Sequence, residues 1–209
     1  MTTLLIVGAT GLVGRAALRQ ALADPRVERV VAPTRRALPA QPRLENPLVD
    51  FDALPGDAPW WRVDGVVCAL GTTMRAAGSR EAFRTVDFEY PLAVARFSRQ
   101  HGARAFALVS SVGAGPRART YYLRVKAETE RALAACGLPS LTIVRPSLLG
   151  GERAEPRPME RLALAATRAL APLVPRRYRV VEADRVAAAL LEGAIGAPPG
   201  VHVVESEAL

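Results

Sequence analysis

Lysine is almost absent from this chain of 209 residues: 27 of its 28 basic side chains are arginine, and Lys126 is the exception. Cysteine and histidine are nearly as scarce. Cys68 and Cys136 lie far apart in the sequence, as do His101 and His202. These four residues lack the spacing of a metal site, and two thiols do not make a disulfide framework. We therefore expect neither a structural metal nor a disulfide.

Long apolar runs are also lacking. No stretch approaches the ~18 residues of a membrane span, and the first residues carry no basic leader. Half of the residues are hydrophobic and only 23% are charged, which excludes a globally disordered chain. The sequence predicts one soluble globular domain over residues 1–209 that stays in the cytoplasm and does not contact a membrane.

The formal net charge of +8 raises nucleic acid as a possible partner. However, the arginines are scattered from Arg15 to Arg185, often beside Asp or Glu, and only 5% of the residues are aromatic. This distribution is typical of an arginine-biased composition. We expect no specific nucleic-acid binding, although steeply salt-dependent binding would indicate it.

The first forty residues show the order strand, glycine turn, helix and strand that opens a parallel βαβ unit. Residues 3–7 and 27–32 are apolar strands, and residues 12–23 carry helical spacing between them. Residues 33–47 hold four prolines and no helical period, so we expect a loop there. A third strand is predicted at residues 44–49.

The same alternation continues along the chain. Strands are predicted at residues 63–70, 104–110, 141–145 and 201–205, and helices at 79–101, with a bend or break at Pro91, and at 119–136, 159–170 and 184–195. This order predicts an α/β fold: a doubly wound parallel sheet of Rossmann type over residues 1–150. A small substrate lobe with a closing helix and strand follows over residues 151–209.

A glycine turn follows the first strand, with the spacing Gly-x-x-Gly-x-x-Gly. Such glycines allow a tight turn, close approach of a pyrophosphate and close packing of the next helix, whose N-terminus favours negative charge. The spacing is one residue wider at its start than the common dinucleotide fingerprint, and a purely structural turn is the alternative. The candidate cofactor-binding residues here are Gly8, Thr10, Gly11, Leu12, Val13 and Gly14.

Arg35 and Arg36 follow the second strand, where NAD-binding proteins usually place an acid and NADP-binding proteins place an arginine for the 2′-phosphate. Because a guanidinium pairs well with a phosphate, the sequence favours NADP over NAD. Arginine is so common in this chain that NAD stays open as the alternative.

Tyr122 and Lys126 lie four positions apart in a predicted helix, so their side chains share one face. A cation about 5 Å from a phenol, at an effective dielectric of roughly 20, stabilises the phenolate by about 3 kcal/mol. A compact ammonium also reaches sugar hydroxyls, which the broad fork of an arginine does less well. We interpret the pair as acid/base groups; a solvated helix surface is the alternative.

Two further loops fall at predicted strand ends, where ligands bind to parallel sheets. Residues Gly71, Thr72 and Thr73 follow the fourth strand and suit the underside of a ribose. Ser110 and Ser111 follow the fifth strand and could present a hydroxyl to a substrate carbonyl, although serines at strand ends are usually turn formers.

Together with Asp50 and the Val86-Asp87 dipeptide, these motifs resemble the short-chain dehydrogenase/reductase superfamily, in its extended or atypical branch, over residues 3–150. Residues 68–73, 108–114 and 122–126 are similar to the small NADPH-binding oxidoreductases related to Tat-interactive protein. The resemblance implies that the glycine turn holds the pyrophosphate, that Arg35 and Arg36 hold the 2′-phosphate, and that Asp50 approaches the adenine.

The same resemblance implies the catalytic roles. Ser111 would hold the carbonyl, with Ser110 as the alternative, Tyr122 would transfer the proton, and Lys126 would bind the nicotinamide ribose. Arg145 and Pro146 resemble the segment that lies along the nicotinamide.

The implied activity is NADPH-dependent reduction of a small-molecule carbonyl substrate. Asp87 departs from the pattern, because many of these enzymes have an asparagine there for a water relay, and an ionised carboxylate cannot donate a hydrogen bond. A non-catalytic NADPH-binding regulatory protein and a sugar-nucleotide epimerase or dehydratase are the alternatives. The short segment after residue 150 makes a bulky sugar nucleotide less fitting, and the sequence predicts no oligomeric state.

Overall fold

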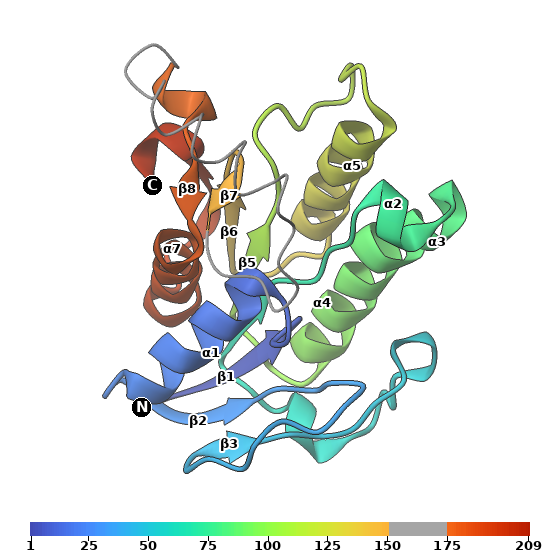
Figure 1. Ribbon diagram of the computed structural model, residues 1–209. Helices are drawn as coiled ribbons and strands as arrows, with labels where there is room; N and C mark the ends of the chain where they lie inside the picture. The colour runs from blue at the N-terminus through green and yellow to red at the C-terminus, as the bar shows by residue number, and fades with distance from the viewer. Residues whose placement is uncertain (151–174) are drawn as a thin grey trace.

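The computed structural model describes residues 1–150 and 175–209. At its centre is a parallel sheet of seven strands in the order β3-β2-β1-β4-β5-β6-β9 (Figure 1). These strands are β1 (Thr2–Val7), β2 (Val27–Val31), β3 (Leu44–Glu45), β4 (Gly65–Cys68), β5 (Ala105–Val109), β6 (Ser140–Arg145) and β9 (Gly200–Glu205). The first six have the order of a Rossmann fold, which confirms the predicted doubly wound sheet.

Helices cover both faces of this sheet (Figure 1). One face carries α1 (Leu12–Ala23) and α7 (Ala183–Gly196), and the other carries α4 (Tyr90–Gln100) and α5 (Tyr121–Ala135). The short helices α2 (Met74–Ala77) and α3 (Arg80–Arg84) precede α4, and β7 (Leu149–Gly150) pairs with β8 (Val181–Glu182) in a separate sheet. Single 3-10 turns are η1 (Phe51–Ala53), η2 (Pro59–Trp61), η4 (Arg176–Tyr178) and η5 (Ser206–Ala208).

The strand predicted for residues 63–70 is shorter in the structure, at Gly65–Cys68, and two other elements differ more from the prediction. The third strand, predicted for residues 44–49, is only two residues long, followed by an isolated bridge between Thr34 and Leu48, because Pro47 has no N–H for the ladder. The helix predicted for residues 79–101 is divided into α3 and α4 by a π-helical turn, η3 (Thr85–Glu89). The interruption therefore comes before Pro91, where it was predicted. The helix predicted for residues 159–170 lies outside the described residues.

The described C-terminal residues build onto the main sheet. β9 pairs in parallel with the whole of β6, and α7 packs on α1, β4, β5 and β6. The predicted boundary at residue 150 stays a prediction, since residues 151–174 lie outside the described part of the chain.

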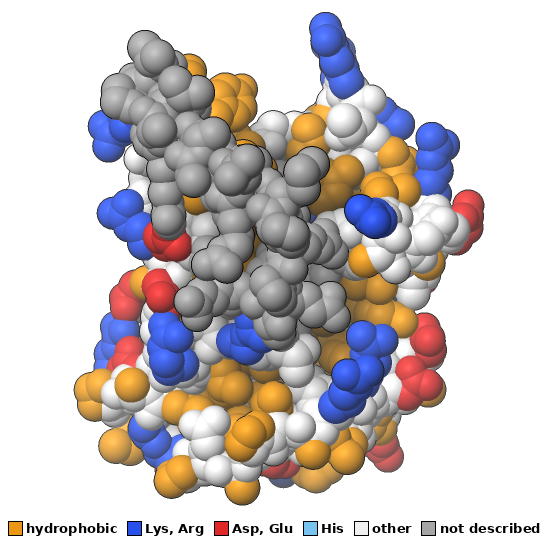
Figure 2. Space-filling view, viewed as in Figure 1, with side chains coloured by type: hydrophobic (Ala, Val, Ile, Leu, Met, Phe, Trp, Pro, Cys, Tyr) orange, Lys and Arg blue, Asp and Glu red, His pale blue; other side chains and the backbone are white. Residues whose placement is uncertain are grey.

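Arginine side chains are spread over the face shown in Figure 2, among hydrophobic and acidic ones, and do not gather in one stripe there. Arg26, for example, pairs with both Asp24 and Glu192. Within the described ranges, no helix is both long and apolar enough to cross a bilayer. The same ranges contain no cluster of three metal-capable side chains, and Cys68 and Cys136 are free thiols.

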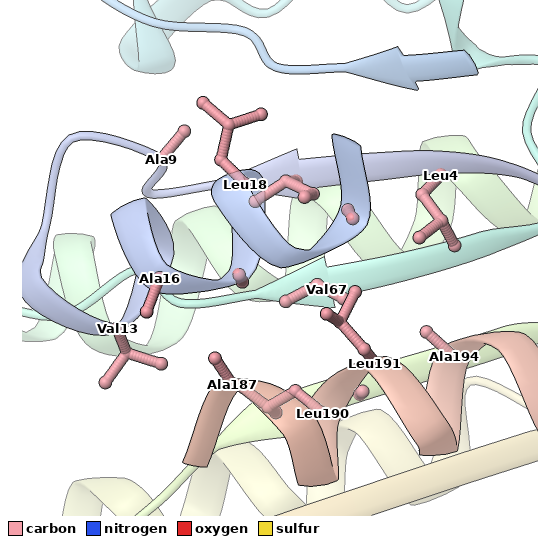
Figure 3. Packing of buried hydrophobic residues seen from close by; sticks show 14 of the residues in the cluster. Leu4, Ala9, Val13, Ala16, Leu18, Val67, Ala187, Leu190, Leu191 and Ala194 are labelled. Atoms are coloured by element: carbon pink, nitrogen blue, oxygen red, sulfur yellow. The ribbon is translucent and has the colours of Figure 1, made fainter. Parts of the chain in front are cut away.

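Alternate side chains of each strand enter the two layers of the core, as the pleat of a strand requires. Leu4 of β1 enters the layer of α1 and α7, whereas Leu5 enters the layer of α4 and α5. Figure 3 shows the apolar side chains of α7 pointing toward α1 and β4. The contact is close, because a Cβ on Gly65 of β4 would lie 2.4 Å from the carbonyl oxygen of Ala194. α7 is thus part of the layer that covers β1 and β4 on one face of the sheet.

Candidate active site

The carboxyl ends of the parallel strands bring the predicted site residues to one edge of the sheet. The register pairs Leu5 with Val31, Val7 with Cys68, and Cys68 with Leu108. The loops that follow these strands, at residues 8–14, 33–38, 71–73 and 110–113, therefore lie side by side. The strand order reverses between β1 and β4, which is where open α/β sheets bind ligands.

The turn after β1 brings backbone atoms into unusually close contact. Gly8 has a φ of 83°, and a Cβ there would lie 2.5 Å from the carbonyl oxygen of Ala69. A Cβ on Gly14 would lie 2.0 Å from the carbonyl oxygen of Gly8. Gly11 begins α1 without a side-chain cap among the described residues, so the first amides of the helix are left to an outside acceptor. These residues fit the pyrophosphate of a dinucleotide.

The remaining predicted residues of this turn differ in burial. Thr10 is exposed, Leu12 is half-buried, and Val13 is buried in the core. Val13 can therefore offer a ligand only its backbone.

Arg35 and Arg36 are exposed in the loop after β2, and neither forms an ion pair with any described residue. Asp50 is also exposed, and its carboxylate accepts a hydrogen bond from the N–H of Asp52 at 3.0 Å, which caps η1. Two exposed guanidinium groups therefore lie at the end of β2, where they can pair with an anionic group.

Lys126 is buried against the loops that follow β4 and β5. Its side chain is 6% exposed, and Nζ lies 2.8 Å from Oδ1 of Asp87, whose side chain is fully buried. The other carboxylate oxygen accepts the N–H of Thr72 at 2.8 Å, and Nζ donates to the carbonyl of Val109 at 3.3 Å. Gly71 lies against this pair, whereas Thr73 caps α2. The ammonium is therefore held beside the predicted ribose loop.

The surroundings of Lys126 keep it charged. Burial by itself lowers the pKa of an ammonium, but attraction to Asp87 and Tyr122 outweighs burial, and the pKa of Lys126 is raised. Burial also raises the pKa of the nearby Cys68 thiol, to about 12. At neutral pH the site therefore holds a lysine cation and an uncharged thiol.

Pro91 explains why Asp87 reaches this lysine. Pro91 has no N–H to donate to the carbonyl of Asp87, four residues earlier, and that carbonyl accepts the hydroxyl of Thr129 at 2.9 Å instead. The helix widens there into the π turn η3, which holds Asp87 in the interior. Such π turns are frequent at functional sites. The sequence predicts a disturbance near Pro91 but not its consequence for Asp87.

Tyr122 is half-buried in the first turn of α5, as the predicted pairing with Lys126 requires. The Nζ of Lys126 lies 5.9 Å from the centroid of the Tyr122 ring, and the centroids of the Phe83 and Tyr122 rings are 5.6 Å apart. Thr120 caps the helix by accepting the N–H of Leu123 at 3.3 Å. The cap and the ring contact fix the tyrosine beside the buried ammonium.

The two candidate serines have different surroundings. Ser110 is buried, and its hydroxyl donates a short hydrogen bond to Glu130. Ser111 is half-buried, and its hydroxyl has a long contact of 3.4 Å with the carbonyl of Val112. The N–H of Val112 donates to the carbonyl of Pro146 at 2.9 Å, which ties this loop to the end of β6. The hydroxyl of Ser111 is therefore more available than that of Ser110 for a hydrogen bond to a substrate.

Arg145 is held by two carboxylates that the sequence did not single out. Its guanidinium lies 2.7 Å from Glu130 and 2.8 Å from Glu205, so it joins α5, β6 and β9. The guanidinium of Arg145 is thus engaged by the protein itself, and the placement of the segment at Arg145 and Pro146 along a nicotinamide stays a prediction. The sequence could have indicated Glu130, because it lies eight residues after Tyr122 and four after Lys126. Residues at this spacing share one face of a helix.

Comparison with known families gives a match over residues 8–192 to the family described as NAD(P)H-binding. The protein fmp52, mitochondrial, of Emericella nidulans is 32% identical over 171 residues, which cover 78% of this chain and 73% of that protein. The protein HTATIP2 of Rattus norvegicus is 35% identical over 163 residues, which cover 76% of this chain and 67% of that protein.

The names of the FMP52 relatives correct one prediction. Because these proteins are named mitochondrial, the predicted cytoplasmic location is wrong. Composition and hydropathy separate membrane-spanning segments from segments in water, but they do not distinguish one aqueous compartment from another.

Among solved structures, MoeE5 in complex with UDP-glucose and NAD has a TM-score of 0.77 and 18% identity, with 97% of this chain and 75% of that chain covered. At this identity the likeness concerns the fold. The chain belongs to the NAD(P)H-binding family, is a homologue of HTATIP2 and FMP52, and has the fold of the extended short-chain dehydrogenases/reductases.

Proposed function

We propose that this protein is an NADPH-dependent reductase of a small carbonyl compound. The observation that carries the proposal is the buried ammonium of Lys126, 2.8 Å from Asp87 and 5.9 Å from the ring of Tyr122, at the edge of the sheet that bears the glycine turn. The family match supports a nicotinamide cofactor. Arg35 and Arg36 support NADP in preference to NAD.

In this proposal Tyr122 is the proton donor. As the substrate carbonyl is reduced, its oxygen gains negative charge, and the phenol transfers its proton to that oxygen to form the alcohol. The Ser111 hydroxyl donates a hydrogen bond to the same oxygen and orients it. The Lys126 ammonium stabilises the phenolate that is left. The reduced nicotinamide, when bound, supplies the hydride that the carbonyl carbon receives.

Isotope transfer tests this reaction. NADPH that carries deuterium at its transferable position is incubated with the protein and a panel of aldehydes and ketones. We expect NADPH loss to equal alcohol formation, with deuterium on the carbinol carbon. Tight NADPH binding without turnover of any panel member would contradict the proposal and favour a non-catalytic regulatory protein.

A sugar-nucleotide epimerase or dehydratase is a second candidate, because the fold is similar to that of MoeE5, which was solved with UDP-glucose and NAD. Such reactions regenerate their cofactor in each turnover. Conversion of UDP-glucose with no net change in the nicotinamide would favour this candidate over a carbonyl reductase.

A further inference from the structure

Asn46 is the single asparagine of the chain, and it lies where the pairing of β2 with the following strand is interrupted. The N–H of Ala32 donates to the carbonyl of Glu45 at 2.8 Å, and the N–H of Thr34 donates to the carbonyl of Pro47 at 3.0 Å. Between these two bonds, a parallel ladder requires residue 47 to donate to the carbonyl of Ala32. Proline has no N–H, so this bond cannot form.

The side chain of Asn46 replaces the missing bond. Its Nδ2 donates to the carbonyl of Ala32 at 2.6 Å and to the hydroxyl oxygen of Thr34 at 2.8 Å. Its Oδ1 accepts the N–H of Leu38 at 2.7 Å. The hydroxyl of Thr34 then donates to the carbonyl of Arg36 at 2.6 Å. One amide therefore holds both ends of the loop at residues 34–38.

This network holds the backbone on both sides of the two candidate phosphate ligands. Thr34 is 4% exposed, whereas the next two residues, Arg35 and Arg36, are exposed. A flexible loop loses conformational entropy when it is ordered around a ligand, and that loss weakens binding. A backbone held in place before binding avoids much of this cost.

We propose that Asn46 is a positioning residue that sets the preference for a nucleotide bearing a 2′-phosphate. It does so by holding the backbone of Arg35 and Arg36 beside the end of β1, where the glycine turn begins. This inference rests on the proposed use of NADPH and deepens it, because it assigns part of the cofactor choice to a residue that does not contact the phosphate.

Equilibrium titration with NADPH and with NADH, in the absence of substrate, tests the inference. We expect Asn46→Ala to weaken NADPH binding about ten-fold and NADH binding less than about two-fold. The double variant Arg35→Ala/Arg36→Ala is the reference, because it removes the guanidinium groups themselves. If the reference loses the NADPH preference and Asn46→Ala keeps it, the inference is wrong.

A second variant separates loop position from strand stability. In Asn46→Ala/Pro47→Ala the new N–H at residue 47 can restore the bond to Ala32, but not the bonds to Thr34 and Leu38. We expect the melting temperature to recover toward the wild-type value while the NADPH preference stays low. Recovery of both together would assign the effect to the strand alone and overturn the inference.

The wild-type titration distinguishes the two proposals. Equal affinity of the wild-type protein for NADPH and NADH would refute the proposed cofactor and, with it, this inference. A wild-type preference for NADPH that survives in Asn46→Ala would refute only the role of Asn46.

Discussion

Asp87 and Lys126 depend on each other, because each is a buried charge whose main partner is the other. Asp87→Asn leaves the ammonium buried without its carboxylate. The variant should lose about 3–5 kcal/mol of unfolding free energy at neutral pH, as measured by urea denaturation. Asp57→Asn, which changes an exposed carboxylate, is the matched control and should unfold like the wild-type protein.

The pH dependence of this loss has a definite sign. The pKa of Lys126 is raised above its ordinary value of 10.5, so the stabilisation is complete below that value and is lost as the pH rises through the folded-state pKa. In Asp87→Asn the ammonium of Lys126 stays buried without its carboxylate, so we expect its pKa to fall below the ordinary value of 10.5. The unfolding free energy of this variant should therefore rise as the pH rises toward that value. The stability difference between the two proteins should therefore narrow toward alkaline pH. A difference that is constant with pH would contradict the coupling.

The two serines should separate stability from turnover. Ser111→Ala should lower kcat by about 10²–10³-fold, because it removes a donor to the substrate oxygen. Ser110→Ala should instead cost about 1–3 kcal/mol of unfolding free energy, because Glu130 loses a buried partner, and should affect kcat much less. Kinetics and denaturation of both variants test this assignment. A large loss of kcat in Ser110→Ala, with little loss in Ser111→Ala, would indicate that Ser110 is the serine that contacts the substrate.

For single residues, the sequence predicted the contacts that follow from the spacing of residues along one helix. Tyr122 and Lys126 share a face of α5 because the helix repeats every 3.6 residues. It did not predict that Asp87 would pair with Lys126, because that contact joins two helical segments through a π turn. The turn depends in part on the hydroxyl of Thr129, 42 residues away in the chain.

Among the elements, the start of α1 depends on close packing at Gly14, where a Cβ would lie 2.0 Å from the Gly8 carbonyl. Gly14→Ala must move α1 away from the turn, so we expect a loss of about 1–3 kcal/mol in unfolding free energy and weaker NADPH binding. Gly196→Ala in α7 is the control, because a Cβ there meets no atom within 4 Å. NADPH titration and denaturation measure both effects. Wild-type affinity in Gly14→Ala would show that the turn does not hold the cofactor.

The helices α1, α5 and α7 follow from repeated apolar spacing and confirm the predicted segments at 12–23, 119–136 and 184–195. α2 has only four residues, too few to show a period. For β3, the run at residues 44–49 has the composition of a strand, but Pro47 interrupts its pairing and Asn46 takes over one bond. Local pattern therefore identified long elements and overestimated the length of a strand at the sheet edge.

For the whole molecule, the candidate cofactor site is made from loops after β1, β2 and β4 together with α5, so a bound cofactor should stabilise the entire fold. At ~100 times its Kd, NADPH should add about 2.7 kcal/mol. We expect a larger rise in melting temperature with NADPH than with NADH at equal concentration. Equal rises would contradict the proposed preference for NADP.

The doubly wound parallel sheet could be predicted from the alternation of strands and helices, because parallel crossovers leave few arrangements. The placement of β9 beside β6 and of α7 beside α1 could not. These contacts, such as the pairing of Leu141 with Val201, are not set by the alternation of strands and helices. They depend on which apolar faces remain uncovered once the sheet has formed.

The most direct test of the proposed chemistry compares two neighbouring tyrosines. Tyr122→Phe should lower kcat for NADPH-dependent carbonyl reduction by about 10²–10⁴-fold, with the Kd for NADPH changed less than about two-fold. Tyr121→Phe loses only a hydrogen bond to the carbonyl of Arg80 and should retain wild-type kcat. If Tyr122→Phe reduces the substrate as fast as the wild-type protein, Tyr122 is not the proton donor and the proposed mechanism is wrong.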